Sequence, residues 1–148
     1  MTVNLTWVTD RIAVGGAIWT TERMMEVARL GVTHVINMQI EFDDTHLGDD
    51  CGVEVLWNPV DDDFEPKPPQ VLARGVDFAL EALREPDTKI FIHCAAGVHR
   101  APMMALALLR VLGFSLEEAK QMIATRRYAV DFASVYVNSV EEYVKSRG

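Results

Sequence analysis

The sequence predicts an α/β fold: a single domain with a mixed, mostly parallel central sheet of about five strands flanked by helices. Three observations predict it. Short β-rich apolar runs alternate with segments of helical periodicity that are ten or more residues long. One helical segment, Ala101–Leu112, is apolar nearly all round, which is typical of a central buried helix. No repeat, linker or charge block divides the chain, so residues 1–148 are predicted to form one domain.

The first elements are predicted to be two short strands and a helix. Leu5–Val8 and Ile12–Val14 flank a polar turn and indicate a hairpin at an antiparallel edge of the sheet. Thr20 or Thr21 can cap the helix that follows, and Gly31 fits the left-handed position that ends it. A buried strand is expected next, over Thr33–Met38.

The middle of the chain is predicted to be less regular. The acidic stretch Glu41–Asp50 indicates a loop, and Val53–Trp57 a short strand. Asn58–Pro69 is rich in Pro and Asp and is predicted to be irregular. Val71–Leu83 has the apolar spacing of a helix.

The last third of the chain is predicted to be a strand followed by helices. Lys89–His93 indicates a strand that runs into the apolar helix. Ser115 and Glu118 form a capping-box pattern that opens the next helix. An amphipathic helix over about Phe132–Lys145 ends the pattern.

Charge and composition exclude several classes of function. Fourteen Lys and Arg against 22 Asp and Glu give a net charge of −8, which argues against nucleic acid and against anionic membrane as partners. Two cysteines, Cys51 and Cys94, cannot build a disulfide scaffold, and residues 1–10 lack a signal-peptide pattern. We therefore expect a cytoplasmic monomer.

The chemistry is concentrated in His93–Pro102, between the last predicted strand and the apolar helix. Ligands of open α/β sheets bind at the carboxyl ends of strands, and a helix start offers free N–H groups to an anion. Gly97 lets the loop curl around one anion, and Arg100 can add a bidentate fork. The predicted phosphate cradle comprises Ala95, Ala96, Gly97, Val98, His99 and Arg100.

Cys94 lies where this positive field stabilises a thiolate, which beneath a bound phosphate is an activated nucleophile. The chemistry implied is phosphoryl transfer to sulfur, followed by hydrolysis of the thiophosphate. The leaving group needs a proton, and a carboxyl group is the natural general acid. Asp61, Asp62 and Asp63 follow a parallel strand and are all candidates on the residues alone.

His93-Cys94-x-x-Gly97-x-x-Arg100 resembles the signature of cysteine-dependent phosphatases, specifically the compact dual-specificity group. Pro59-Val60-Asp61-Asp62 is similar to the general-acid loop of that family, and this resemblance selects Asp62 as the acid. It also implies the cysteine-dependent phosphatase fold, catalysis without metal or cofactor, and phosphorylated proteins or small phosphomonoesters as partners. His93 is expected to support the loop through hydrogen bonds.

Two departures from the family pattern bear on turnover and substrate. The family usually places Ser or Thr after the loop arginine, where its hydroxyl helps the thiolate to leave, and this chain has Ala101. Arg-Ala-Pro at that place is similar to plant glucan phosphatases, which raises a phosphoglucan substrate. The loop also lacks the lysines of phosphoinositide phosphatases, so inositol-lipid headgroups are expected to be unfavourable.

Several alternatives remain open on the sequence. A rhodanese-like sulfurtransferase also uses a cysteine in an anion loop, and Ala101 is compatible with a phosphate-binding module of slow turnover. Cys51 is a conceivable redox partner of Cys94. Arg126 and Arg127 are expected to be solvated at a helix end, outside the site.

Overall fold

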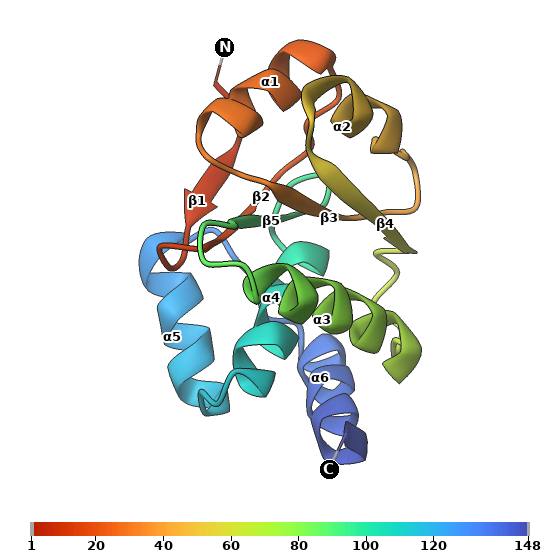
Figure 1. The fold of residues 1–148 in the computed structure, drawn as a ribbon. Coiled ribbons are helices and arrows are strands. Elements are labelled where there is room, and N and C mark those ends of the chain that lie inside the picture. Colours follow the sequence, from red (N-terminus) through yellow and green to blue (C-terminus); the bar gives the residue numbers. More distant parts are fainter. Residues whose placement is uncertain (1, 148) are drawn as a thin grey trace.

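The computed structural model describes residues 2–147, so the end residues Met1 and Gly148 of the predicted domain lie outside the described residues. Its centre is a five-stranded sheet in the order β1-β2-β5-β3-β4, which confirms the predicted fold class (Figure 1). β1 pairs antiparallel with β2 and the other strand pairs are parallel, as predicted for the edge. The strands are β1 (Leu5–Trp7), β2 (Ile12–Gly15), β3 (His34–Gln39), β4 (Glu54–Val60) and β5 (Ile90–His93).

Helices cover both faces of the sheet, with α1 and α2 on one side and α3 to α6 on the other (Figure 1). The predicted caps are confirmed: the Thr20 side chain accepts a hydrogen bond from the Arg23 N–H, and Ser115 and Glu118 form a capping box. The helices are α1 (Thr21–Arg29), α2 (Thr45–Cys51), α3 (Pro69–Leu83), α4 (Arg100–Val111), α5 (Leu116–Arg126) and α6 (Ser134–Arg147).

Each face of the sheet has its own hydrophobic core. Along β5, Ile90 and Ile92 join the core beneath α3 to α6, whereas Phe91 joins the core beneath α1 and α2. Every residue of α4 from Arg100 to Leu109 is buried, which confirms the prediction of a central helix. The loop that precedes α4 is therefore attached to a fully buried strand, β5, and to the buried first turns of α4.

The prediction that residues 41–50 form a loop is wrong, because Thr45–Cys51 is helix α2. Asp43 accepts hydrogen bonds from the backbone and the hydroxyl of Thr45 where the helix begins. Leu47 is the single large apolar residue that the helix buries in the core, so no helical periodicity marks the segment.

The predicted strand end at Trp57 is also wrong, because β4 continues through Asn58 and Pro59 to Val60. Pro59 lacks an N–H for a strand ladder, but β4 is the outer strand of the sheet, where one side needs no partner. The parallel strands β3, β4 and β5 all end at one edge of the sheet. That edge carries Glu41, Asp62 and Cys94 on three neighbouring loops.

None of the helices within residues 2–147 has the length and apolarity that a bilayer crossing requires.

Candidate active site

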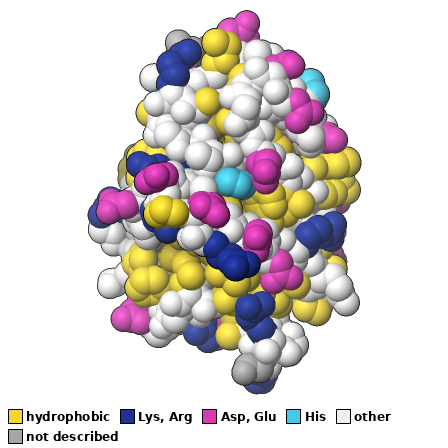
Figure 2. Space-filling view, in the orientation of Figure 1, with side chains coloured by type: hydrophobic (Ala, Val, Ile, Leu, Met, Phe, Trp, Pro, Cys, Tyr) yellow, Lys and Arg dark blue, Asp and Glu magenta, His cyan; other side chains and the backbone are white. Residues whose placement is uncertain are grey.

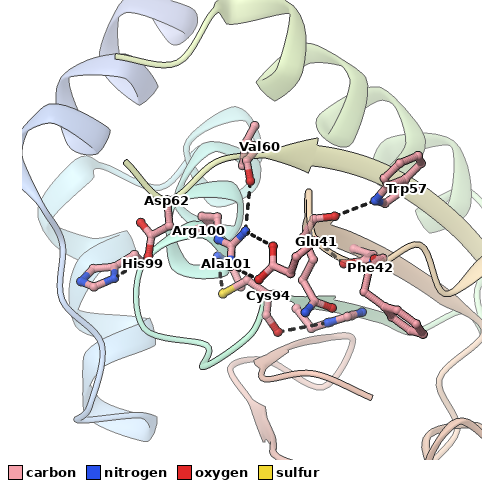
Figure 3. Close-up of polar contacts among 12 residues, drawn as sticks. Glu41, Phe42, Trp57, Val60, Asp62, Cys94, His99, Arg100 and Ala101 are labelled. Carbon is pink, nitrogen blue, oxygen red and sulfur yellow. Dashed lines mark hydrogen bonds and ion pairs between the residues drawn. The ribbon is translucent and has the colours of Figure 1, made fainter. Parts of the chain in front are cut away.

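The cysteine loop, residues 94–99, joins β5 to α4. Cys94 is 2% exposed, and its Sγ accepts a hydrogen bond from the backbone N–H of Ala101, in the first turn of α4, at 3.3 Å (Figure 3). The start of a helix presents free N–H groups and the positive end of the macrodipole. The sulfur thus lies where a thiolate is stabilised.

The carbonyl groups of the cysteine loop are bound by groups outside it. The Ala95 carbonyl accepts from the N–H of Ala17 at 3.0 Å, and the Val98 carbonyl from the N–H of Asp131 at 2.9 Å. The carbonyls of Ala96 and Gly97 accept from the guanidinium of Arg127 at 3.0 and 2.9 Å. Within the described part of the chain, the backbone N–H groups of residues 95–100 donate to no protein acceptor. They remain available to an anion.

Arg127 holds this loop from outside the site. It is 9% exposed and also donates to the side chains of Asn4 and Thr6, at 3.0 and 2.9 Å. Burial lowers the pKa of its guanidinium. The expectation that Arg126 and Arg127 are both solvated is therefore wrong for Arg127, which reaches back across the loop to the N-terminal strand.

Gly97 adopts a conformation that the loop requires. Its φ is +72°, in the left-handed region that favours glycine. A Cβ at this position would collide with the Gly15 carbonyl and with the Arg127 guanidinium. The glycine therefore permits both the turn and the close approach of Arg127.

The Arg100 guanidinium is paired with Glu41 in a bidentate arrangement. Nη1 donates to Oε1 at 2.7 Å and Nη2 to Oε2 at 2.8 Å, and Nη1 also donates to the Val60 carbonyl at 3.0 Å (Figure 3). The hydrogen bond to Arg100 lowers the pKa of Glu41 to about 2, and the same contact raises the pKa of Arg100. Both side chains are charged at neutral pH.

This pairing still leaves one edge of Arg100 for a ligand. A guanidinium has five N–H donors, and Glu41 and Val60 take three of them. The Nε of Arg100 is buried and has no hydrogen-bond partner among residues 2–147. The Nε and Nη2 donors can therefore bind two oxygens of one anion.

The three aspartates after β4 lie in different environments. Asp63 accepts from the Lys67 ammonium and from the N–H of Glu65. Asp62 contacts His99 of the cysteine loop, with Oδ2 at 3.1 Å from Nδ1, and accepts from the Tyr136 hydroxyl at 2.8 Å. Asp61 is exposed and makes no side-chain hydrogen bond within residues 2–147. Asp62 is the one of the three that reaches the cysteine loop.

His93 lies beneath the loop in a fully buried pair with Asp44. Its Nε2 is 2.8 Å from Asp44 Oδ2, and its Nδ1 is 3.3 Å from the Cys94 carbonyl. The amide of Asn37 donates to the other oxygen of Asp44 at 2.9 Å. The sequence pattern does not indicate Asp44, because this buried residue lies in the acidic stretch that is predicted to be a loop.

Cys51 lies away from this chemistry, at the end of α2. Its Sγ faces the Thr21 carbonyl at 3.9 Å, and burial raises the pKa of its thiol. Neither Cys51 nor Cys94 forms a disulfide within residues 2–147. The Cys51 sulfur makes no contact with Cys94 within residues 2–147. In the same described range, no group of His, Cys, Asp and Glu side chains is arranged to hold a metal ion.

A cysteine at the base of an anion loop between a parallel strand and a helix, with an arginine six positions on, defines the class of cysteine-dependent phosphatases. Residues 18–146 match the family model described as "Dual specificity phosphatase, catalytic domain", so the chain belongs to this family of cysteine-dependent phosphatases. The match decides against the sulfurtransferase alternative.

Curated relatives and solved structures agree with this family. The chain is 29% identical to "Dual specificity protein phosphatase 5" of Rattus norvegicus over 119 residues, which are 78% of this chain and 29% of that protein. The chain thus spans under a third of the length of that relative. It is also 29% identical to "Protein tyrosine phosphatase type IVA 2" of Mus musculus, over 80% of this chain and 70% of the relative.

The crystal structure of PTPMT1 is similar, with a TM-score of 0.81 and 25% identity over 96% of this chain and 94% of that one. The crystal structure of Tk-PTP in its active form is similar in fold, with a TM-score of 0.83 and 23% identity over 98% of this chain and 99% of that one.

Proposed function

We propose that this chain hydrolyses phosphomonoesters through a phosphocysteine intermediate, with Cys94 as nucleophile and Asp62 as general acid and then base. One observation carries the proposal. The buried Cys94 thiol begins a loop in which, within residues 2–147, the backbone N–H groups of residues 95–100 have no protein acceptor and the Nε of Arg100 has no hydrogen-bond partner. The phosphate is bound by these N–H groups, and His93 supports the loop from below.

In the first step, the Cys94 Sγ attacks phosphorus while the ester P–O bond breaks. The electron pair of that bond goes to the leaving oxygen, which takes a proton from Asp62. The N–H groups and the Arg100 fork stabilise the charge on the equatorial phosphoryl oxygens.

In the second step, the Asp62 carboxylate takes a proton from a water molecule whose oxygen attacks phosphorus. The S–P bond breaks, its electron pair returns to Sγ, and inorganic phosphate leaves. No metal or cofactor takes part. Because Ala101 has no hydroxyl, its backbone N–H is the donor that stabilises the departing thiolate.

We propose phosphotyrosine, phosphoserine and phosphothreonine of proteins as the substrates. The names of the relatives, a dual specificity protein phosphatase and a protein tyrosine phosphatase, support this class. A solved structure of PTPMT1 contains PI(5)P, so a phosphoinositide belongs among the substrates to be compared. Acidic side chains are scattered over the face seen in Figure 2. Glu41 contacts Arg100, Asp131 contacts His99, and Asp61 precedes Asp62, so the site is bordered by acidic groups that disfavour highly phosphorylated ligands.

A phosphate-release panel tests this proposal. Phosphotyrosine and phosphoserine peptides, a phosphoglucan and PI(5)P vesicles are compared with a chelator present, with and without vanadate. We expect release from the peptides, inhibition by vanadate, and a loss of about 10³-fold or more in Cys94→Ser. Cys51→Ser is the matched control and should keep wild-type turnover. Wild-type turnover in Cys94→Ser contradicts the mechanism, and release from the glucan or the lipid alone overturns the substrate class.

A further inference from the structure

His99, the last residue of the cysteine loop, bridges two carboxylates. Its Nδ1 lies 3.1 Å from Asp62 Oδ2, and its Nε2 lies 3.1 Å from Asp131 Oδ2. The carboxylates come from different segments, the loop after β4 and the segment before α6. Phe64 packs its ring edge-on against the imidazole, with centroids 4.9 Å apart. The imidazole is therefore fixed between its two partners.

The bridge has a place for a transferable proton. A neutral imidazole has one N–H and can donate at one of the two N···O contacts, whereas an imidazolium donates at both. The trio of His99, Asp62 and Asp131 can therefore hold one proton more than a neutral histidine between two carboxylates.

Tyr136 fixes which oxygen of Asp62 faces the histidine. Its hydroxyl donates to Asp62 Oδ1 at 2.8 Å and accepts from the N–H of Phe64 at 3.1 Å, so its proton is directed to Asp62. Burial, with the Asp62 carboxylate beside it, raises the pKa of Tyr136 to about 12, which keeps the hydroxyl a donor at every ordinary assay pH. Tyr136 thus occupies Oδ1 of Asp62 and leaves Oδ2 to face His99 Nδ1.

We propose that His99 stores the proton that Asp62 delivers to the leaving group, with Asp131 holding the opposite nitrogen; this rests on the proposed function. As the ester bond breaks, the Nδ1 proton of the imidazolium moves to the Asp62 carboxylate, and Asp62 passes one proton to the leaving oxygen. Asp62 ends this step as a carboxylate, and His99 is neutral and keeps its Nε2–H on Asp131. In hydrolysis, the Asp62 carboxylate takes a proton from water and passes it back to Nδ1, which restores the starting state.

The charged neighbours of His99 favour this arrangement. Carboxyl groups of Asp62 and Asp131 contact both ring nitrogens, whereas Arg100 turns its guanidinium toward Glu41. Asp63 is engaged by Lys67, Asp61 faces solvent, and Tyr136 touches Asp62 rather than the ring. Cys94 lies in the same loop. The ring is therefore held by acceptors on both sides, with Asp62 placed between it and the leaving group.

The test compares His99→Gln with His46→Gln, a histidine of α2 outside the site. Glutamine keeps a donor toward Asp62 but cannot store a proton. With a phosphoserine peptide, whose leaving group needs a proton, we expect kcat/KM of His99→Gln to fall by about 10²-fold or more. With 4-nitrophenyl phosphate, whose leaving group needs little protonation, the loss should be at least tenfold smaller. The pH above which phosphoserine turnover declines should move down, because a glutamine side chain holds no transferable proton.

Three outcomes overturn the inference. Equal losses on both substrates, or an unmoved pH profile, assign His99 a purely structural role. If His99→Gln keeps the wild-type rate on the phosphoserine peptide while Asp62→Asn shows the leaving-group-dependent loss, the proton store is wrong and the proposed function is still supported. Absence of phosphate release by the wild type from either substrate defeats the proposed function itself. If His99→Gln does not fold, Asp131→Asn carries the test, with the same substrate contrast expected at about tenfold and an equal loss on both substrates again contradicting the store.

Discussion

Replacing Arg127 with lysine keeps the positive charge but removes the planar fork that holds the cysteine loop. Arg127 makes four hydrogen bonds of 2.9–3.0 Å, two to loop carbonyls and two to the side chains of Asn4 and Thr6. A lysine ammonium at this position cannot span both groups of acceptors. The carbonyls of Ala96 and Gly97 then lose the Arg127 guanidinium as their partner, and the peptide units whose N–H groups we propose to bind the phosphate can rotate.

The magnitude follows from the number of bonds lost. Hydrogen bonds to a charged group contribute about 1.5–3 kcal/mol each, and lysine retains part of them, so we expect the free energy of unfolding to fall by about 2–4 kcal/mol. Reorientation of the N–H groups should lower kcat/KM by about 10- to 100-fold. Arg126→Lys is the matched control, because Arg126 is exposed and makes no side-chain hydrogen bond within residues 2–147; its stability should change by under about 0.5 kcal/mol.

The assay is urea unfolding followed by circular dichroism, together with phosphate release measured in buffer, where both variants are folded. If Arg127→Lys and Arg126→Lys both match the wild type in stability and in phosphate release, the Arg127 guanidinium does not hold the cysteine loop in its active conformation.

Three further changes test separate parts of the site. Glu41→Gln should lower the free energy of unfolding at pH 7 by about 1–2 kcal/mol, a value discounted because Glu41 is partly exposed. Because the pKa of Glu41 is lowered to about 2, its stabilising effect is present above about pH 4.5 and is lost toward pH 2. The difference between variant and wild type should therefore shrink below pH 4.5 in pH-dependent urea melts, and a constant difference would contradict the pairing. Gly97→Ala should lose about tenfold or more in kcat/KM, because the added Cβ collides with Gly15 and Arg127. The control Gly113→Ala, also at positive φ but with open space around it, should lose stability alone. Equal activity in the two variants would be evidence against the collision. Ala101→Ser should raise the rate of phosphocysteine hydrolysis several-fold in stopped-flow burst kinetics, because it restores a hydroxyl beside Cys94, and an unchanged rate would show that the backbone N–H suffices.

Local patterns predicted most of the fold. Alternating strands and helices, the caps at Thr20 and Ser115 and the apolar α4 are properties of neighbouring residues, and the structure confirms them. Helix α2 could not be predicted, because a seven-residue helix with one buried large apolar side chain has no periodicity to detect. The end of β4 was missed because Pro59 breaks most strands, and its place on the outer strand is decided by tertiary structure.

The residues that support the site were harder to predict than the cysteine loop itself. Glu41 meets Arg100 across 59 positions of sequence, and Tyr136 meets Asp62 across 74. Nothing local distinguishes Arg127 from Arg126, although one is buried and the other is exposed. Such contacts depend on which loops the sheet brings together at its carboxyl edge, and a sequence pattern with a period of a few residues does not contain that information.

Covalent trapping of the phosphorylated nucleophile tests the role proposed for Cys94. The protein is mixed with a phosphotyrosine peptide or an aryl phosphate, quenched in acid during turnover, and digested for mass spectrometry. We predict phosphate on the Cys94 sulfur in the wild type, retained in Cys51→Ser and absent in Cys94→Ser. Turnover with Cys94 unmodified, or with the phosphate on another side chain, would contradict it.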